Sequence, residues 1–209
     1  MVRIAQPKLY IEERKPFIET DERFYYLNGE FSENPAQALN LRDITFDSCL
    51  FDHIDFSRIG MTGVSLIDCE FRNCDLSNRT FDGCQCRRVI FRDCRLVGIS
   101  FIEASLKDVQ IINSKCQLAN LSQSHIDRLL FKDSDCRQIY LNNAETQHLQ
   151  FERCDLERAE MCRCSLKGTD LSSSDISGLI TDAESVRGLK VSRWQASELV
   201  SLFGIEVKD

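Results

Sequence analysis

Cysteine is the residue type of this chain with the widest chemical potential, because thiols form disulfides, ligate metals and act as nucleophiles. The 209 residues include 11 cysteines. Their number is odd and no C-x-x-C pair is present, so neither a disulfide framework nor a metal site is predicted. All but Cys162 fall on the apolar positions of the repeat described below, where a free thiol packs as a small hydrophobic side chain. We therefore predict free thiols in a reducing compartment, and no metal or other cofactor.

Histidine and carboxylate side chains form no pattern that is typical of an active site. The three histidines, His53, His125 and His148, stand among charged residues, as solvated surface side chains do. Aspartate is frequent, but it is also a preferred turn residue, so pairs of carboxylates have little diagnostic value. The sequence has no glycine-rich phosphate loop, no H-E-x-x-H and no catalytic serine motif. The sequence therefore predicts a protein that is not an enzyme.

A period of five residues organises most of the chain. Every fifth residue from Leu41 to Ile176 is apolar, with Thr146 as the one exception. The position two residues before each of these centres is mostly small or branched, and the remaining three positions are mainly polar. Because this period matches neither an α-helix nor a β-strand, a repeat architecture is indicated.

Two inward and three outward residues in every five describe a chain that turns a corner at each pentapeptide and closes a square after four. The segments CDLSN at residues 74–78 and CDLER at residues 154–158 follow the pattern A(D/N)LXX, and the chain resembles the pentapeptide-repeat family. The resemblance implies an all-β fold, a right-handed quadrilateral parallel β-helix of about seven coils with a short C-terminal helix. Equivalent residues of successive coils would then stack at about 4.8 Å.

Three regions follow from this reading. Residues 1–38 contain all three prolines and form an N-terminal cap or arm, residues 39–191 form the β-helix, and residues 192–209 form a C-terminal helix and dimerisation segment. The helix is expected to begin after Ser192 as N-cap and to stop at Gly204. No segment approaches the roughly 20 apolar residues that span a membrane, and the N-terminus lacks a secretory apolar region. A cytoplasmic protein without membrane contact is predicted.

The outer surface is expected to bind a partner. The formal net charge of −7 disfavours direct binding of nucleic acid, which requires a basic surface. One outward column of the coils is acidic at both ends and interrupted in the middle by Arg95 and Lys115. A protein that normally grips DNA could accept such an edge as a substitute; alternatively, aspartate is simply favoured and solvated at this turn position. The candidate partner-binding residues are Asp55, Asp75, Asp135, Asp155, Glu157 and Asp175.

The C-terminal sequence lies outside the repeat and narrows the choice of partner. WQASEL at residues 194–199, followed by LFGIEV at residues 202–207, resembles the terminal signature of Qnr-type quinolone-resistance proteins. The resemblance implies a homodimer joined through its C-termini, and a DNA-mimicking rod that binds DNA gyrase or topoisomerase IV and protects against quinolones or topoisomerase toxins. By position, the dimer contacts would be Trp194, Leu199, Leu202, Phe203, Ile205 and Val207. The alternative is a helix that only caps the last coil.

Two departures from that family keep a second function open. Many Qnr-type members have loops that project from the coil, whereas here the phase is unbroken, and the N-terminal segment is unusually long. The alternative is a general protein-interaction scaffold with an unrelated partner. In that hypothesis the outward apolar residues Leu50, Ile90 and Leu130 form an edge that docks a protein ligand or the N-terminal arm.

Overall fold

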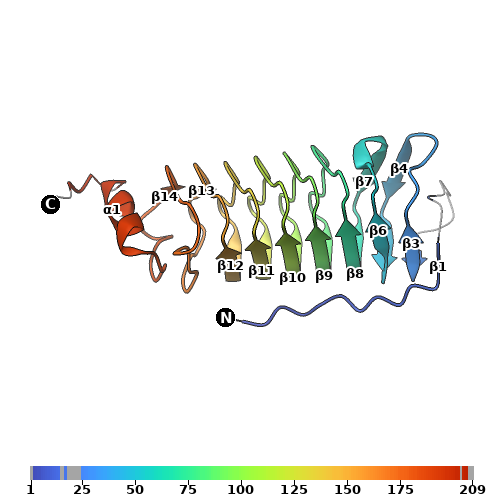
Figure 1. Cartoon of the computed structure of the whole chain (residues 1–209), viewed down its shortest axis with the longest axis horizontal. Helices are drawn as coiled ribbons and strands as arrows, with labels where there is room; N and C mark the ends of the chain where they lie inside the picture. The colour runs from blue at the N-terminus through green and yellow to red at the C-terminus, as the bar shows by residue number, and fades with distance from the viewer. Residues whose placement is uncertain (1, 15–16, 18–24, 203, 207–209) are drawn as a thin grey trace.

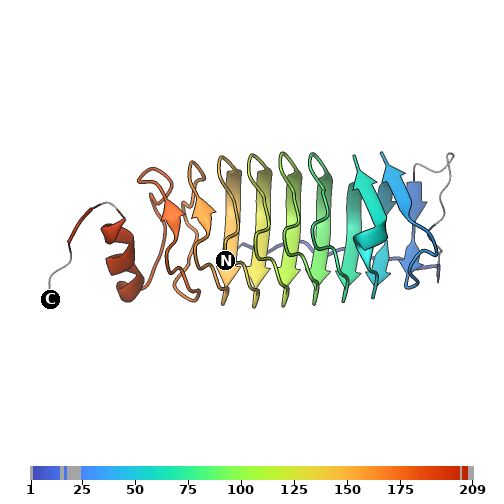
Figure 2. The same ribbon diagram turned by 90° about the horizontal axis from the view of Figure 1, so that it is seen from above.

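The computed structural model of the chain describes residues 2–14, 17, 25–202 and 204–206. The coils stack along one axis into a straight rod, an extended N-terminal segment runs along one side, and a helix covers the far end (Figures 1 and 2). The rod is a parallel β-solenoid of about eight turns with one short C-terminal helix. The predicted fold class is therefore confirmed.

The strands of the coils pair in parallel with a shift of one coil, or four pentapeptides, as in Phe71 opposite Phe91 and Leu106 opposite Ile126. The large sheet holds β1 (Glu13–Arg14), β3 (Gly29–Phe31), β6 (Leu50–Asp52), β8 (Ser65–Arg72), β9 (Gln85–Arg92), β10 (Ser105–Ile112), β11 (His125–Lys132) and β12 (Glu145–Glu152), with β2 (Tyr25–Leu27) and β5 (Thr45–Asp47) joined to it. Smaller sheets pair β4 (Leu39–Arg42) with β7 (Ile59–Thr62), next to the 3-10 helix η1 (Phe56–Arg58), and β13 (Glu160–Met161) with β14 (Ile180–Thr181). The helix α1 spans Arg193–Ser201.

The stack begins before residue 39, the expected start of the β-helix. Strand β2 pairs with β5, and β3 pairs with β6, both with the one-coil shift of the later strands. Tyr26 and Phe31 are buried in phase with the repeat, because they stand one coil before Phe46 and Phe51. This first coil accounts for the extra turn.

From Gly63 to Gly168 each corner of the coil places one residue at positive φ, two positions after a core centre. Asp68, Leu118 and Arg128 illustrate this with φ of 52°, 60° and 63°. Glycine takes the same place at Gly98, with φ of 65°. Asn, Asp and Gly tolerate this conformation best, which explains why they are frequent at that position.

An aromatic column fills the interior along one edge. The ring centroids of Phe51 and Phe71 lie 4.5 Å apart and those of Phe71 and Phe91 lie 4.8 Å apart, with near-parallel planes. The column continues beyond the first coil, where Phe17 stacks on Phe31 at 4.6 Å. Phe17 therefore closes the N-terminal end of the core and shields the ring of Phe31 from water.

The cysteine thiols serve as small core side chains. All 11 are free, and all but the half-buried Cys162 are buried. The thiol of Cys94 lies 3.2 Å from the carbonyl oxygen of Arg92 and 3.5 Å from that of Phe71, so it donates a weak hydrogen bond within the coil. Burial, together with a hydrogen bond that the Cys69 thiol donates to Cys49, holds the pKa of Cys69 well above its ordinary value, which keeps this thiol protonated.

Thr146, the exception in the apolar row, lies on β12, where the large sheet ends. The next coil forms turns rather than a strand over residues 165–172. The hydroxyl of Thr146 donates to the carbonyl of Ser165, and the hydroxyl of Thr169 donates to the carbonyl of Leu149 at 3.2 Å. Side-chain hydroxyls therefore satisfy carbonyls that lack a backbone donor at this point.

Candidate protein-interaction surfaces

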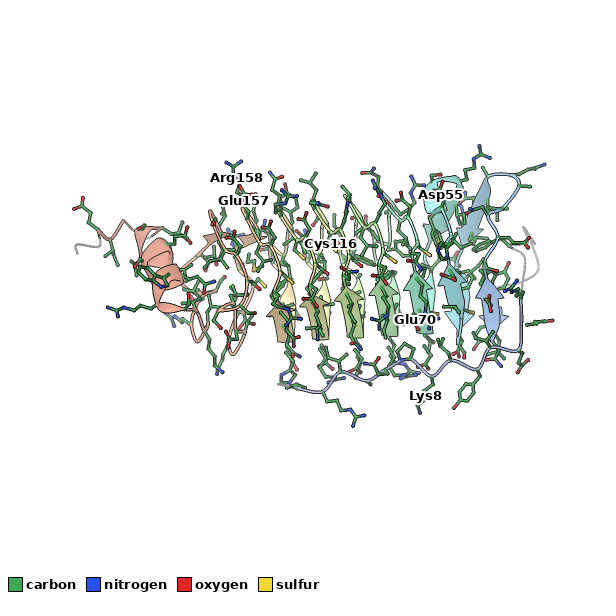
Figure 3. All side chains as sticks on the ribbon, in the orientation of Figure 1. Lys8, Asp55, Glu70, Cys116, Glu157 and Arg158 are labelled. Atoms are coloured by element: carbon green, nitrogen blue, oxygen red, sulfur yellow. The ribbon has the colours of Figure 1, made fainter. Side chains whose placement is uncertain are left out.

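The predicted acidic residues share one edge of the rod. Bridges between successive coils join Asp55 to Asp75, and Asp135 through Asp155 to Asp175. Arg95 and Lys115 stand between these two groups, as the sequence requires. Figure 3 shows Asp55 and Glu157 along this edge, opposite Lys8 and Glu70. We call these stacked carboxylates, with Glu157, the acidic edge.

Each aspartate of the acidic edge also caps a turn of its own coil. The carboxylate of Asp175 accepts from the amide of Ser177 at 2.9 Å, and that of Asp155 accepts from the amide of Glu157 at 3.0 Å. Hydrogen bonds from the hydroxyl and amide of Ser177 lower the pKa of Asp175, so this carboxylate remains charged. Turn capping therefore favours aspartate at these positions, in addition to any role of the carboxylates in binding a partner.

Cations neutralise part of the acidic edge. Arg137 lies 2.7 Å from Asp135 and 3.5 Å from Asp155, and Arg95 lies 3.2 Å from Asp75. These side chains are substantially exposed, so the ion pairs contribute little to stability but reduce the local negative potential. Asp175 accepts only from Ser177 among the described residues, so no ion pair there neutralises this carboxylate.

The C-terminal helix is fixed to the last coil by one glutamine. Ser192 and Gln195 form a capping box at the start of α1. The side-chain amide of Gln195 also donates to the carbonyls of Leu171 and Ser174 at 2.9 and 2.7 Å. Gln195 therefore joins the helix to the open end of the solenoid and satisfies two of its carbonyls.

The predicted dimer contacts divide into a buried and an exposed set. Leu199 is buried against the last coil. Trp194 is 86% exposed, and Leu202 and Ile205 are about half exposed, at 46% and 55%. Phe203 and Val207 lie outside the described residues. The rod thus ends in several large apolar side chains that face solvent in the single chain.

The N-terminal segment of residues 2–14, called the strap here, lies on the side of the rod away from the acidic edge (Figures 1 and 3). Its backbone binds side chains of several coils. The amides of Tyr10, Lys8 and Ala5 donate to Ser48 Oγ, Asp68 Oδ1 and Asp108 Oδ1 at 2.6, 2.9 and 3.1 Å, and the carbonyl of Val2 accepts from Gln150 Nε2 at 3.3 Å. Among strap side chains, Ile4 is buried and Pro7 and Leu9 are half-buried.

Two arginines hold the carboxylates that receive the strap. Arg88 binds both oxygens of Asp68, and Arg128 binds both oxygens of Asp108, at 2.6 and 3.0 Å. Partial burial disfavours the charged form of Asp68, but the bonds from Arg88 and the Lys8 amide outweigh it and lower the pKa. The bond from Arg128 likewise lowers the pKa of Asp108, against partial burial and with help from the Ala5 amide. Both carboxylates are therefore preformed acceptors.

Sequence reasoning did not identify these acceptors. It proposed Leu50, Ile90 and Leu130 as a docking edge, and Ile90 is indeed buried although it occupies an outward position. The signal for the polar column was available as Ser48, Asp68, Arg88, Asp108 and Arg128, in which acid and base alternate from one coil to the next. The histidines lie at the surface, where His125 approaches Glu145 at 3.2 Å and His53 approaches Asp52 at 2.9 Å.

No group of three or more His, Cys, Asp or Glu side chains within the described part of the chain could hold a metal ion. No helix there has the length and apolar character to cross a membrane.

Solved structures with similar coils include two named proteins. HetL, involved in heterocyst differentiation regulation in the cyanobacterium Nostoc sp. strain PCC 7120, is 16% identical, with a TM-score of 0.47 over 82% of this chain and 89% of HetL. A trypsin-treated form of QnrB1, described as a plasmid-mediated fluoroquinolone resistance protein, is 17% identical, with a TM-score of 0.42 over 97% of this chain and 99% of QnrB1. No curated protein matches the chain by sequence.

Family models match the coils directly. The model described as pentapeptide repeat region matches residues 64–135, and the model described as pentapeptide repeats (8 copies) matches residues 40–78 and 147–178. Together they span most of the solenoid, whose strands pair from one coil to the next around buried centres. The chain belongs to the pentapeptide-repeat family.

Proposed function

We propose that this protein is a non-enzymatic, protein-binding rod of the cytoplasm whose partner is DNA gyrase or topoisomerase IV. In this role it would act as a DNA mimic and protect the enzyme against quinolones or topoisomerase toxins. The observation that carries the proposal is the stacked acidic edge, in which carboxylates of successive coils lie beside one another as phosphates do along a nucleic acid strand.

The C-terminal end extends this argument. A homodimer joined through α1 would bring the group Asp135, Asp155 and Asp175 of one copy toward the same group of the other, because a two-fold interface pairs identical ends. The longest acidic stretch would then lie at the centre of the dimer, away from Arg95 and Lys115 of each copy. The exposed Trp194, Leu202 and Ile205 provide apolar area for that junction.

DNA supercoiling by purified gyrase in the presence of an inhibitory fluoroquinolone tests this proposal. The protein is titrated from substoichiometric amounts to excess. We expect supercoiling to recover at low ratios and to decline at high ratios, where the rod competes with DNA. A chain with Asp155→Asn and Asp175→Asn should lose this effect, because asparagine keeps the turn-capping oxygen but removes the charge.

The matched control is Asp170→Asn. Asp170 caps Ser172 with the same geometry, at 3.0 Å, but lies on a different column of the coils. This variant should retain full protection. Equal activity of all variants would contradict the acidic-edge mechanism, and no effect of the unchanged protein would contradict the proposed partner.

A general interaction scaffold is the second candidate, and the ion pairs along the acidic edge favour it. Because Arg137 contacts both Asp135 and Asp155, the edge is less uniformly negative than a strand of DNA. In the scaffold hypothesis the rod still binds protein, but through another face and to an unrelated partner. The supercoiling titration separates the two candidates.

A further inference from the structure

The strap is held mainly through its backbone. Ala5 and Lys8 meet carboxylates that lie two coils apart, and two coils rise by about 10 Å. The step from Ala5 to Lys8 also spans about 10 Å in an extended chain. An extended polypeptide whose backbone turns these two amides toward the same side matches the spacing of Asp68 and Asp108, as the strap does, and this match depends on backbone geometry and not on side-chain identity.

The strap covers a row of outward side chains that combines amide acceptors with an apolar contact. We define the strap groove by its amide acceptors Ser48, Asp68 and Asp108 together with the neighbouring outward residues Ile90 and Gln110. With the strap in place all five are at least nine-tenths buried, although they occupy outward positions of the coils. The groove thus combines fixed acceptors with an apolar contact, as peptide-binding surfaces do.

The strap leaves one buried donor of the groove without a partner. Gln110 is 6% exposed, and its side-chain amide nitrogen makes no hydrogen bond within the described part of the chain. Two coils further on, Gln150 occupies the same column and donates to the carbonyl of Val2. A buried donor without an acceptor is costly, so the strap is an imperfect ligand of its own groove.

We propose that the strap groove binds an extended segment of another protein, and that the strap is its intramolecular competitor. The partner segment places backbone amides on Ser48, Asp68 and Asp108, an apolar side chain in the position of Ile4, and a carbonyl oxygen within reach of Gln110. Satisfying Gln110 gives the partner an advantage that the strap lacks. This inference rests on the proposed role in protein binding, but not on the identity of gyrase as the partner.

Proline substitutions in the full-length chain test this proposal, because proline removes the amide hydrogen without altering the groove. The variant with Ala5→Pro and Lys8→Pro should release the strap. The probe is a fluorescent peptide with the sequence of residues 2–12, whose binding is followed by fluorescence anisotropy. We expect the peptide to bind this variant at least about tenfold more tightly than the unchanged chain.

The matched control is Gln6→Pro, because the amide of Gln6 makes no hydrogen bond within the described part of the chain. This variant should bind the peptide as weakly as the unchanged chain. A peptide carrying the two prolines should not bind any of the chains. Equal affinity of the double variant and the control, or no binding to either, would overturn the proposal.

Hydrogen exchange on the unchanged protein provides a test that does not depend on the proline variants. Adding excess peptide should accelerate exchange at the Ala5 and Lys8 amides of the chain, since the peptide displaces the strap. In the Gln110→Met chain, which removes the unpaired donor, the same amides should exchange about tenfold more slowly than in the unchanged chain. Failure of either response would contradict competition at this groove.

The same exchange experiment shows whether the strap on each rod belongs to that chain or to a second copy. Protection of the strap amides should not depend on protein concentration, because each strap lies on its own rod. Protection that falls on dilution would show that the strap of a second copy fills the groove, and would overturn the proposal. If the peptide does not bind but the protein protects gyrase, the topoisomerase proposal stands and the strap-groove proposal is wrong.

Discussion

The residue two positions after each core centre carries the conformational strain of the coil. It adopts positive φ at every regular corner from Gly63 to Gly168, whether or not it is glycine. Side chains other than glycine lose roughly 1–2 kcal/mol in this region, with asparagine and aspartate affected least. The strain is tolerated because the same residue donates a backbone hydrogen bond to the next coil, as Leu118 does to Arg137 at 3.1 Å.

Leu118→Asn tests this account of the corners. Leu118 has a φ of 60° and its side chain is 44% exposed, so little packing is lost on replacement. We expect the free energy of unfolding to rise by about 0.5–1 kcal/mol, measured by denaturant titration. Leu118→Ala shortens the side chain without relieving the strain and should give no gain. An equal gain for alanine would attribute the effect to removal of an exposed apolar side chain.

The carboxylates below the strap make its attachment depend on pH. Because the folded pKa values of Asp68 and Asp108 lie below the ordinary value, their contribution is present above that value and is lost as pH falls through the folded pKa. Arg88 and Arg128 keep their charge throughout. We expect the amide resonances of Ala5 and Lys8 to move toward unfolded positions below about pH 4.

That acid transition has a specific control. A chain with Asp68→Asn and Asp108→Asn cannot titrate at these sites, so its strap resonances should not follow the same pH dependence. An unchanged transition in this variant would assign the acid effect to other carboxylates of the rod.

At the scale of elements, the sheet and the coil do not end together. The large sheet stops at β12, yet the coil continues as far as α1. Threonine hydroxyls replace backbone donors across this boundary, and Gln195 satisfies the carbonyls at the final edge. Each coil contacts only its neighbours, so a lost bond is expected to loosen the nearby coils rather than the whole rod.

Thr169→Val tests the importance of the hydroxyl at that boundary. Valine keeps the shape of the side chain, which is only 4% exposed, but leaves the carbonyl of Leu149 without this donor. We expect a loss of about 1 kcal/mol, seen as faster hydrogen exchange in residues 165–190. Thr80→Val, at an exposed threonine without a side-chain hydrogen bond in the described part of the chain, should leave exchange unchanged. Equal exchange in both variants would contradict a role for the hydroxyl.

At the scale of the whole molecule, the two ends of the rod are closed differently. Phe17 covers the aromatic column at the N-terminal end, whereas α1 covers the C-terminal end and leaves Trp194 exposed. An open solenoid end is prone to uncontrolled association; α1 covers one such end and presents exposed apolar side chains there. If the proposed homodimer forms, this asymmetry predicts contact through the C-terminal ends.

Trp194→Asp tests that pairing. If the proposed homodimer forms, the introduced aspartate should separate the two copies and so halve the molar mass measured by light scattering. The melting temperature of the rod should stay nearly unchanged, because Trp194 is exposed in the single chain. Ser197→Asp places the same charge at another exposed position of α1 and should remain dimeric. A monomeric unchanged protein, or equal dissociation of both variants, would contradict the proposed contact.

The sequence alone determined the solenoid, the stacking of equivalent residues in successive coils and the burial of the thiols. These features follow from a local period, because a side chain that recurs at every fifth position meets its own image in each coil. For the same reason the acidic edge could be assembled from the sequence, although its binding role stays a prediction. Thr146, the exception in the row, lies on β12, the last strand of the large sheet.

Only the tertiary structure decided where the strap lies and how charges are paired. The bond between Ala5 and Asp108 joins residues that are 103 positions apart, and no repeat relates the strap to the coils. Arg137 could likewise have extended into solvent, but its position between Asp135 and Asp155 neutralises both. Periodicity fixes contacts between equivalent residues, whereas contacts between unlike segments depend on the surfaces that the folded coils present.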